Sequence, residues 1–148
     1  DDGVGRILLK GDGMFDAYFS PWRLREAILE NGWFATGDLG RTDKDGFLFL
    51  AGREKNIINF AGMKIFPEEV EDVLNQHPDV AQSLVYGIDH DTYGELPVAD
   101  IVPARGRTPD MTAIRRFSYS RLAVNKVPKK IRVVEKLHLT ASGKLRRW

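Results

Sequence analysis

The 148-residue sequence contains no cysteine, which excludes disulfide bonds and thiol catalysis and favours a cytoplasmic location. No apolar run approaches the ~20 residues that a membrane helix needs, so no membrane span is expected. The acidic first residues lack the charged-then-apolar pattern of a secretion signal. Hydrophobic residues make up 43% of the chain and charged residues 29%, which is ordinary for a globular protein and argues against disorder.

Positive charge is concentrated at the C-terminal end. Residues 126–148 contain eight lysines and arginines against one acid, so the first 125 residues sum to −6 within a net charge of +1. Such an end could bind an anionic ligand or nucleic acid, or it could be a solvated, lysine-rich surface. Aromatic side chains that could stack on bases are not interleaved with these charges. We therefore favour the solvated surface and expect no nucleic-acid partner.

The N-terminal third predicts one strand and one helix. Residues 6–10 are a short apolar run between glycines, which favours a strand. Ser20 followed by Pro21 is typical of a helix start, and Asn31-Gly32 would end that helix. These two elements do not complete a layer of their own. Residues 1–54 are therefore expected to be the trailing edge of a larger domain.

The rest of the chain predicts a small α+β domain with a short sheet of antiparallel and mixed strands and two to three packed helices. Asp45-Gly46 predicts a hairpin joining residues 39–42 to residues 47–51, and Ala61-Gly62 predicts a second, between 56–60 and 63–66. Pro67 opens a helix whose first turn is acidic. Further strands are expected at 80–88, 98–102 and 131–135, and a helix capped by Thr108-Pro109.

Four blocks in order resemble those of ATP-dependent adenylate-forming enzymes, the AMP-binding superfamily of acyl-CoA synthetases, luciferases and nonribosomal-peptide adenylation domains. They are GRILLKG at 5–11, GWFATGDL at 32–39, GREKNII and GMKIFPEEVE between 52 and 71, and KVP at 126–128 followed by LTASGK at 139–144. The resemblance spans nearly the whole chain and is specific because the blocks keep their order and spacing. Ala35 and Asn56 depart from it, standing where a basic and an acidic residue are common.

The resemblance implies an enzyme that joins a carboxylic acid to ATP, with Mg²⁺ carried by the ATP, and then passes the acyl group from AMP to the thiol of CoA. By the same resemblance Asp38 binds the ribose of AMP and Arg53 helps to hold it. Lys144 matches the catalytic lysine, an ammonium that offsets the negative charge developing at the α-phosphate. No catalytic metal site is expected within the chain itself.

The resemblance also implies that residues 55–148 form a mobile C-terminal domain. Lys55 matches the hinge on which such a domain turns between adenylation and thiolation. Gly62 then lies on the pantetheine path of CoA, where a residue without a side chain lets a slender arm pass, and Lys64 could meet phosphates nearby.

The phosphate loop and acid-binding pocket of these enzymes belong to a large N-terminal domain, for which no matching loop occurs here. The sequence therefore predicts a C-terminal fragment of an acyl-CoA synthetase, inactive alone, whose partner is the missing domain. Two alternatives are an adenylation domain that loads a carrier protein and a fatty acyl-AMP ligase. A third is a non-catalytic binding module with the same fold. The acid itself is not predicted.

Overall fold

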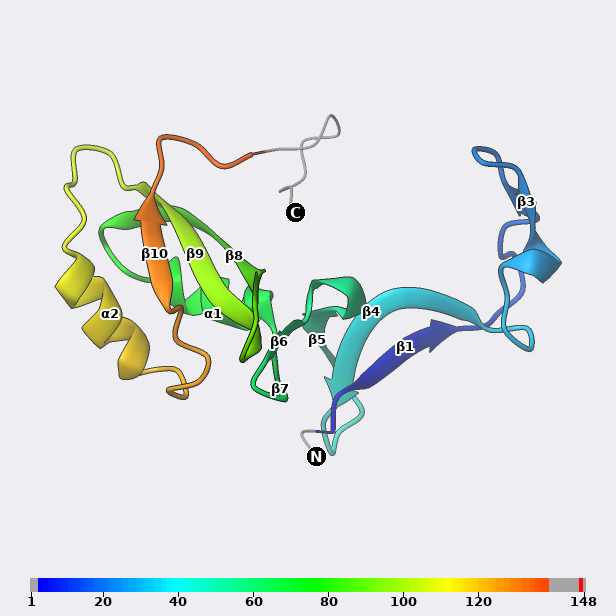
Figure 1. Ribbon diagram of the computed structural model, residues 1–148. Helices are drawn as coiled ribbons and strands as arrows, with labels where there is room; N and C mark the ends of the chain where they lie inside the picture. The colour runs from blue at the N-terminus through cyan, green and yellow to red at the C-terminus, as the bar shows by residue number, and fades with distance from the viewer. Residues whose placement is uncertain (1–2, 139–146, 148) are drawn as a thin grey trace. The chain divides into compact units, whose positions relative to one another are not determined.

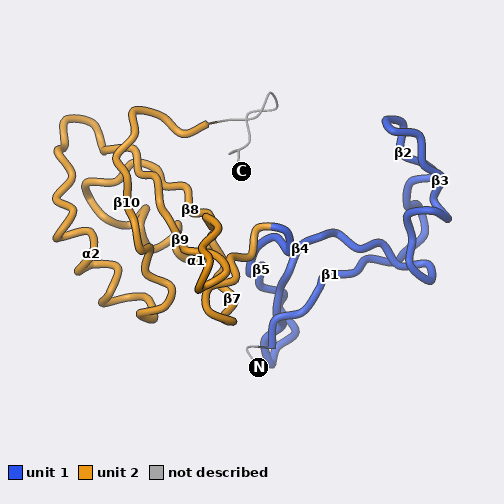
Figure 2. Tube along the Cα trace, viewed as in Figure 1, with its two compact units in different colours: residues 1–55 blue, residues 56–148 orange. Residues whose placement is uncertain are grey.

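The computed structural model describes residues 3–138 and residue 147, and the chain divides into two compact units, Asp1–Lys55 and Asn56–Trp148 (Figure 2). No helix among the described residues is long and apolar enough to cross a membrane.

The first unit is built on a three-stranded antiparallel sheet in the order β1-β4-β5 (Figure 1). These strands are β1 (Gly5–Leu9), β4 (Phe34–Thr42) and β5 (Leu48–Arg53). The turn between β4 and β5 contains Gly46 at a φ of +84°, a conformation that glycine adopts without steric cost. The hairpin predicted from Asp45-Gly46 is therefore confirmed.

The helix expected after Ser20-Pro21 is not formed. In its place lie a two-stranded ribbon, β2 (Ala17–Tyr18) paired with β3 (Arg23–Leu24), and a single 3-10 turn, η1 (Arg25–Ala27). Pro21 lies between β2 and β3, in the turn of this ribbon, and does not open a helix. The N-cap interpretation was wrong because the same serine and proline also suit a tight turn.

The first unit buries little apolar surface. Leu39 is its one large hydrophobic residue in the buried class, at 7% exposure. Eleven other large hydrophobic side chains are exposed, from 43% at Leu8 to 89% at Phe19. A layer normally stabilises itself by burying one face, and this sheet has no second layer of its own among the described residues.

The second unit has a sheet centred on a long antiparallel hairpin, β8 (Val80–His90) and β9 (Gly94–Pro103). The strand β10 (Lys130–Val133) runs parallel to β9 along the side that β8 leaves open. The short hairpin of β6 (Ile58–Phe60) and β7 (Met63–Ile65) joins the same sheet where Phe60 pairs with Gly94. The mixed sheet and the second predicted hairpin are thus confirmed.

Two helices complete the second unit, α1 (Pro67–Leu74) and α2 (Met111–Tyr119). Pro67 opens α1 as predicted. The cap of α2 was placed two residues too early: Asp110 is the N-cap, and its carboxylate accepts hydrogen bonds from the backbone N–H groups of Thr112 and Ala113. A carboxylate at an N-cap satisfies two helix donors that lack backbone partners.

Apolar side chains lie on both faces of this sheet. The larger cluster contains residues of both helices and of β6 to β9, among them Val70, Leu74, Ile101, Ile114 and Val127, each at 0% exposure. A smaller cluster gathers Leu84, Tyr86, Val98 and Leu137. Neighbouring residues of β8 and β9 alternate between the clusters because successive strand side chains point to opposite faces. The predicted α+β domain with two packed helices is confirmed.

Candidate functional site

Asp38 and Arg53 lie directly opposite each other in the β4–β5 pair, and Arg53 Nε is 2.7 Å from Asp38 Oδ1. The sequence placed both residues at a nucleotide site, and the fold brings them together. The Asp38 side chain is 32% exposed and that of Arg53 is 50% exposed. The pair is therefore a charge-assisted contact open to solvent, where a ligand could reach the carboxylate.

The backbone around Asp38 is held by its neighbours. Thr36 donates its hydroxyl to the carbonyl of Ile7 at 3.0 Å and accepts the N–H of Asp38 at 3.0 Å. Gly37 has a φ of +75°, and a Cβ there would lie 4.0 Å from Arg53 Nη1. Within β4, residues 36–38 thus hold a backbone conformation that aims the carboxylate at Arg53, and the positive φ at Gly37 favours glycine.

The hinge role predicted for Lys55 and the catalytic role predicted for Lys144 remain untested. Lys55 is exposed and belongs to η2 (Glu54–Asn56), a 3-10 turn at the boundary of the first compact unit. Lys144 lies outside the described residues. The hinge and the catalytic role therefore stay predictions.

Gly62 lies in the tight turn between β6 and β7, with φ +79°, after Ala61 at φ +50°. Two consecutive positive φ angles define a type I′ turn, whose geometry alone accounts for a glycine at 62. A Cβ on Gly62 would meet nothing within 4 Å, so the space beside it is open. Lys64 is exposed two residues later, opposite Asn59. Their role toward CoA stays a prediction.

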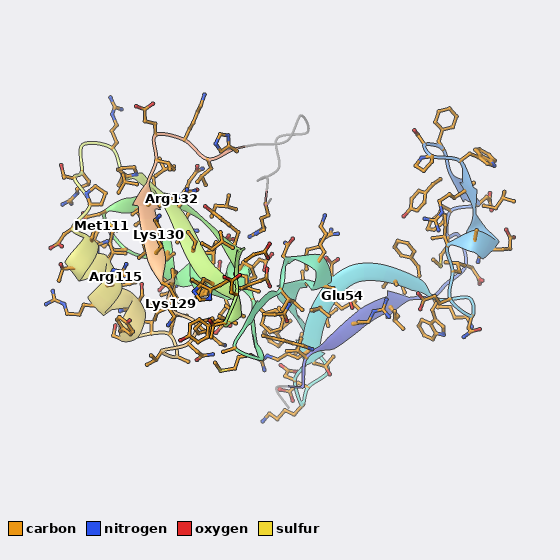
Figure 3. All side chains as sticks on the ribbon, viewed as in Figure 1. Glu54, Met111, Arg115, Lys129, Lys130 and Arg132 are labelled. Carbon is orange, nitrogen blue, oxygen red and sulfur yellow. The ribbon has the colours of Figure 1, made fainter. Side chains whose placement is uncertain are left out.

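Three cations of the basic end form ion pairs, while their side chains keep exposures of 19% to 45%. Lys126 pairs with Glu69, Arg132 with Asp100, and Arg147 with Glu68 and Glu71. Lys129 and Lys130, which are labelled in Figure 3, are exposed. Three of the eight basic side chains of residues 126–148 are therefore paired with acids of the second unit, which weakens a nucleic-acid interpretation further.

Arg132 and Asp100 form a two-pronged ion pair between β10 and β9. Arg132 Nε is 2.6 Å from Asp100 Oδ1, and Nη2 is 2.7 Å from Oδ2. The hydroxyl of Tyr86 accepts from Arg132 and donates to Asp100 Oδ2 at 3.3 Å. The hydrogen bond to Asp100 raises the pKa of Arg132, and Asp100 itself is 4% exposed. The cluster joins three strands, β8, β9 and β10, and is a structural element of the sheet.

Glu71 is a buried carboxylate that the sequence did not single out. It lies on the apolar stripe of α1 at 8% exposure, accepts the N–H of Val85 at 2.6 Å, and contacts Arg147. Burial raises its pKa, while the bonds from Val85 and Arg147 act in the opposite direction. Glu71 follows Val70 directly and precedes Leu74 by three residues, so its position falls on the apolar face of the helix. An acid at such a position indicates that a buried partner for its charge exists.

Residues 69–144 match the family model of the AMP-binding enzyme C-terminal domain, which covers about half of the chain. The fold has the same two helices and mixed sheet as solved acyl-CoA ligases of this kind. The chain belongs to the family of AMP-binding enzyme C-terminal domains, in the adenylate-forming acyl-CoA ligase superfamily. The resemblance inferred from the four blocks is confirmed.

Relatives and structures agree on this family. The chain is 39% identical over 144 residues to 2-succinylbenzoate–CoA ligase of Geobacillus kaustophilus, and 40% identical over 143 residues to oxalate–CoA ligase of Arabidopsis thaliana. The o-succinylbenzoate CoA synthetase of Bacillus subtilis, solved with its acyl-adenylate intermediate, superposes with a TM-score of 0.87 at 37% identity. The same enzyme solved with ATP and magnesium gives a TM-score of 0.84.

These matches span almost the whole chain but a minor part of each relative. They cover 97% of this chain for both ligases and 96% for the B. subtilis structures. The chain in turn spans 28% of the Arabidopsis ligase, 29% of the Geobacillus ligase and 29% of the B. subtilis synthetase.

Proposed function

We propose that this chain is the C-terminal part of an AMP-forming acyl-CoA ligase. In such an enzyme a carboxylate oxygen of the acid attacks the α-phosphorus of ATP and pyrophosphate leaves. The thiol of CoA then gives up its proton and attacks the acyl carbon, and AMP leaves. The observation that carries the proposal is the pairing of Asp38 with Arg53 at 2.7 Å in a chain whose relatives are CoA ligases.

The proposal assigns residues 1–54 to the trailing edge of a large N-terminal AMP-binding domain. The poor burial of the first unit supports this assignment, because a sheet with one buried large hydrophobic residue needs apolar cover from elsewhere. Figure 1 shows β1 and β4 side by side, with no helix drawn over them within their unit. Residues 55–148 would then be the mobile domain, turning at Lys55.

Asp38 fits a ribose. The two hydroxyls of a ribose diol are donors, and a carboxylate offers acceptor oxygens to both. Arg53 orients the carboxylate through its contact at 2.7 Å, while solvent still reaches it. The proposal assigns Mg²⁺ to the phosphates of ATP, as the resemblance implies.

Lys144 would act in the first half-reaction only. Its ammonium would lie near the α-phosphate while the carboxylate attacks, stabilising charge that concentrates in the transition state. After the domain turns, the open turn at Gly62 would face the thiol path, and Lys64 would meet phosphates of CoA. Each of these residues would act in one half-reaction and not in the other, so its role can be tested by measuring the two half-reactions separately.

The test uses the full-length ligase and follows both half-reactions. Lys144→Ala should lower acid-dependent ATP–pyrophosphate exchange by at least about 10²-fold, since a group that stabilises transition-state charge is worth that much. Acyl transfer to CoA from preformed acyl-AMP should remain within about twofold. Lys130→Ala, which removes an exposed lysine, is the matched control and should leave both rates unchanged.

The other interpretations give different results. A non-catalytic module predicts normal exchange in Lys144→Ala. A ligase that loads a carrier protein or stops at acyl-AMP would form AMP without consuming CoA. Lys55→Pro should uncouple the two half-reactions, and unchanged rates would rule out the hinge. The chain alone should show no exchange, since the proposal places the phosphate loop in the other domain.

A further inference from the structure

The strand β4 is irregular at the candidate nucleotide site. In its pairing with β1, Arg6 lies opposite Leu39. Two residues further along β1, Leu8 lies opposite Ala35, so residues 36–38 of β4 face a single residue of β1. A regular antiparallel ladder places one residue opposite one, and this part of β4 is therefore a bulge with two extra residues. Bulges change the direction of nearby side chains and are frequent next to active sites.

The hydroxyl of Thr36 bridges this bulge. It donates to the carbonyl of Ile7 at 3.0 Å and accepts the N–H of Asp38 at 3.0 Å, and both contacts are partly buried. A hydroxyl has one proton to donate and lone pairs that accept, and both functions are used here. The two backbone groups belong to different strands, at the point where the ladder is interrupted. One side-chain oxygen therefore fixes the backbone of the bulge.

The position of Asp38 depends on this bridge. Asp38 ends the bulge and pairs across the sheet with Arg53 of β5. Its carboxylate contacts Arg53 at 2.7 Å, but the Arg53 side chain is 50% exposed, and an ion pair so open to solvent is a weak constraint by itself. The hydrogen bond from the Asp38 N–H to Thr36 restrains the backbone that carries the carboxylate. The two contacts together determine how the carboxylate oxygens face solvent.

We infer that Thr36 is a positioning residue for ribose recognition, which acts through Asp38 and sets the preference for a ribonucleotide over a deoxyribonucleotide. The inference rests on the proposed role of Asp38 toward the ribose. A diol is held when both carboxylate oxygens meet both hydroxyls at once, and hydrogen bonds weaken steeply when their angles are poor. A carboxylate on a relaxed bulge would meet one hydroxyl at most.

The experiment measures acid-dependent pyrophosphate exchange by the full-length ligase with ATP and with 2′-deoxyATP. The ratio of kcat/KM for the two nucleotides reports the contact to the 2′-hydroxyl. The unmodified enzyme should prefer ATP by about tenfold or more, because a hydrogen bond to a charged group is worth that much. Thr36→Val keeps the shape of threonine without the hydroxyl and should reduce this preference to within about threefold, chiefly through a higher KM for ATP. Thr36→Ser keeps the hydroxyl and should retain the preference to within about twofold.

The matched control is Thr42→Val, the same chemical change at an exposed position of β4 beyond the bulge. It should leave the preference for ATP unchanged. The ratio does not depend on how much enzyme is folded, because both nucleotides are assayed with the same sample. A role of Thr36 in folding alone would lower both rates and leave their ratio unchanged, which would overturn the inference. Thr36→Ala removes the hydroxyl with a smaller side chain and replaces Thr36→Val if that variant does not fold.

A double-mutant cycle shows whether Thr36 acts through Asp38. In the Asp38→Ala enzyme no carboxylate remains to be positioned, so adding Thr36→Val should change kcat/KM for ATP by less than about twofold. A further loss of about tenfold in that background would show that Thr36 acts on something else, and would overturn the inference.

Failure of the inference and failure of the proposed function give different results. If Asp38→Ala removes the preference for ATP but Thr36→Val keeps it to within about twofold of the unmodified enzyme, Thr36 is not a positioning residue and the proposed function stands. If Asp38→Ala leaves the preference unchanged, the proposed role of Asp38 toward the ribose is wrong, and the positioning inference fails with it.

Discussion

Lys126 Nζ lies 2.8 Å from both carboxylate oxygens of Glu69, joining residues 57 positions apart. Each residue belongs to one of the blocks by which the family was recognised. Their neighbours Val70 and Val127 are fully buried in the same core cluster. These parts of the blocks therefore hold α1 and the chain before β10 together, and their residue types follow from packing and pairing.

A double-mutant cycle on Lys126→Met and Glu69→Gln should give a coupling energy of about 0.5 kcal/mol, within the range for solvent-accessible pairs. The value stays small because the Glu69 side chain is 42% exposed. Urea unfolding of the chain measures it, with Lys130→Met as an unpaired surface control. Coupling above about 3 kcal/mol would mean that the pair behaves as a buried one.

Stability should depend on pH through Glu71. Its pKa in the folded chain is raised above the ordinary 4.5, chiefly by burial, so the stability it contributes is full below 4.5 and declines as pH rises through the raised pKa. Arg147→Met removes two influences that lower this pKa and should raise it further. The free energy of unfolding of Arg147→Met should therefore fall below that of the unmodified protein by almost nothing at low pH and by about 3 kcal/mol at pH 7.

Denaturant unfolding between pH 4 and pH 7 checks this trend. Glu71→Gln/Arg147→Met has no ionisable side chain at either position and serves as the control, since its stability lacks the contribution of Glu71. A deficit of Arg147→Met that is the same at both ends of the pH range would contradict the assignment to Glu71.

Ala61 carries backbone strain that can be relieved. Its φ of +50° is costly for a residue with a Cβ and easy for glycine or asparagine. Ala61→Asn should stabilise the second unit by about 0.5–1 kcal/mol, which raises Tm by a few degrees in a domain of this size. Gly62→Ala, at φ +79°, should lower Tm, and an unchanged Tm in both variants would refute the turn.

Gly40 is required by close packing in the first unit. A Cβ there would lie 2.8 Å from the carbonyl oxygen of Phe49 and 3.0 Å from Ile7 Cδ1, although its φ is not positive. Gly40→Ala should therefore cost about 1–3 kcal/mol and weaken the pairing of β4 with both neighbours.

Amide hydrogen exchange across β4 and β5 in the full-length protein measures that effect. Gly5→Ala in β1 is the control, because a Cβ there would meet nothing within 4 Å. If Gly40→Ala and Gly5→Ala lost the same protection from amide exchange, any glycine replacement in this sheet would be destabilising. That result would refute the explanation by a steric clash at Gly40.

Several elements of this fold, and two residues of the candidate site, could be predicted from short stretches of the sequence. Gly46 and Gly62 adopt the positive φ that tight turns need, and Pro67 restricts its own φ, so the two hairpins and the start of α1 could be predicted. Asp38 and Arg53 could be matched to a family block, and the β4–β5 hairpin then brings them opposite each other. The helix expected after Ser20 failed because one local pattern suits two structures.

The tertiary structure alone decided which charges meet. Arg147 and Glu71 are 76 residues apart, and no periodicity links them. Their pairing follows from the path of β8, β9 and β10, which brings the end of the chain against α1. Short-range rules describe φ and ψ, whereas the partner of a buried charge depends on the whole chain's packing. The sequence by itself determined most of the strands and helices and the family. Only the tertiary structure decided which acids the basic residues near the C-terminus pair with.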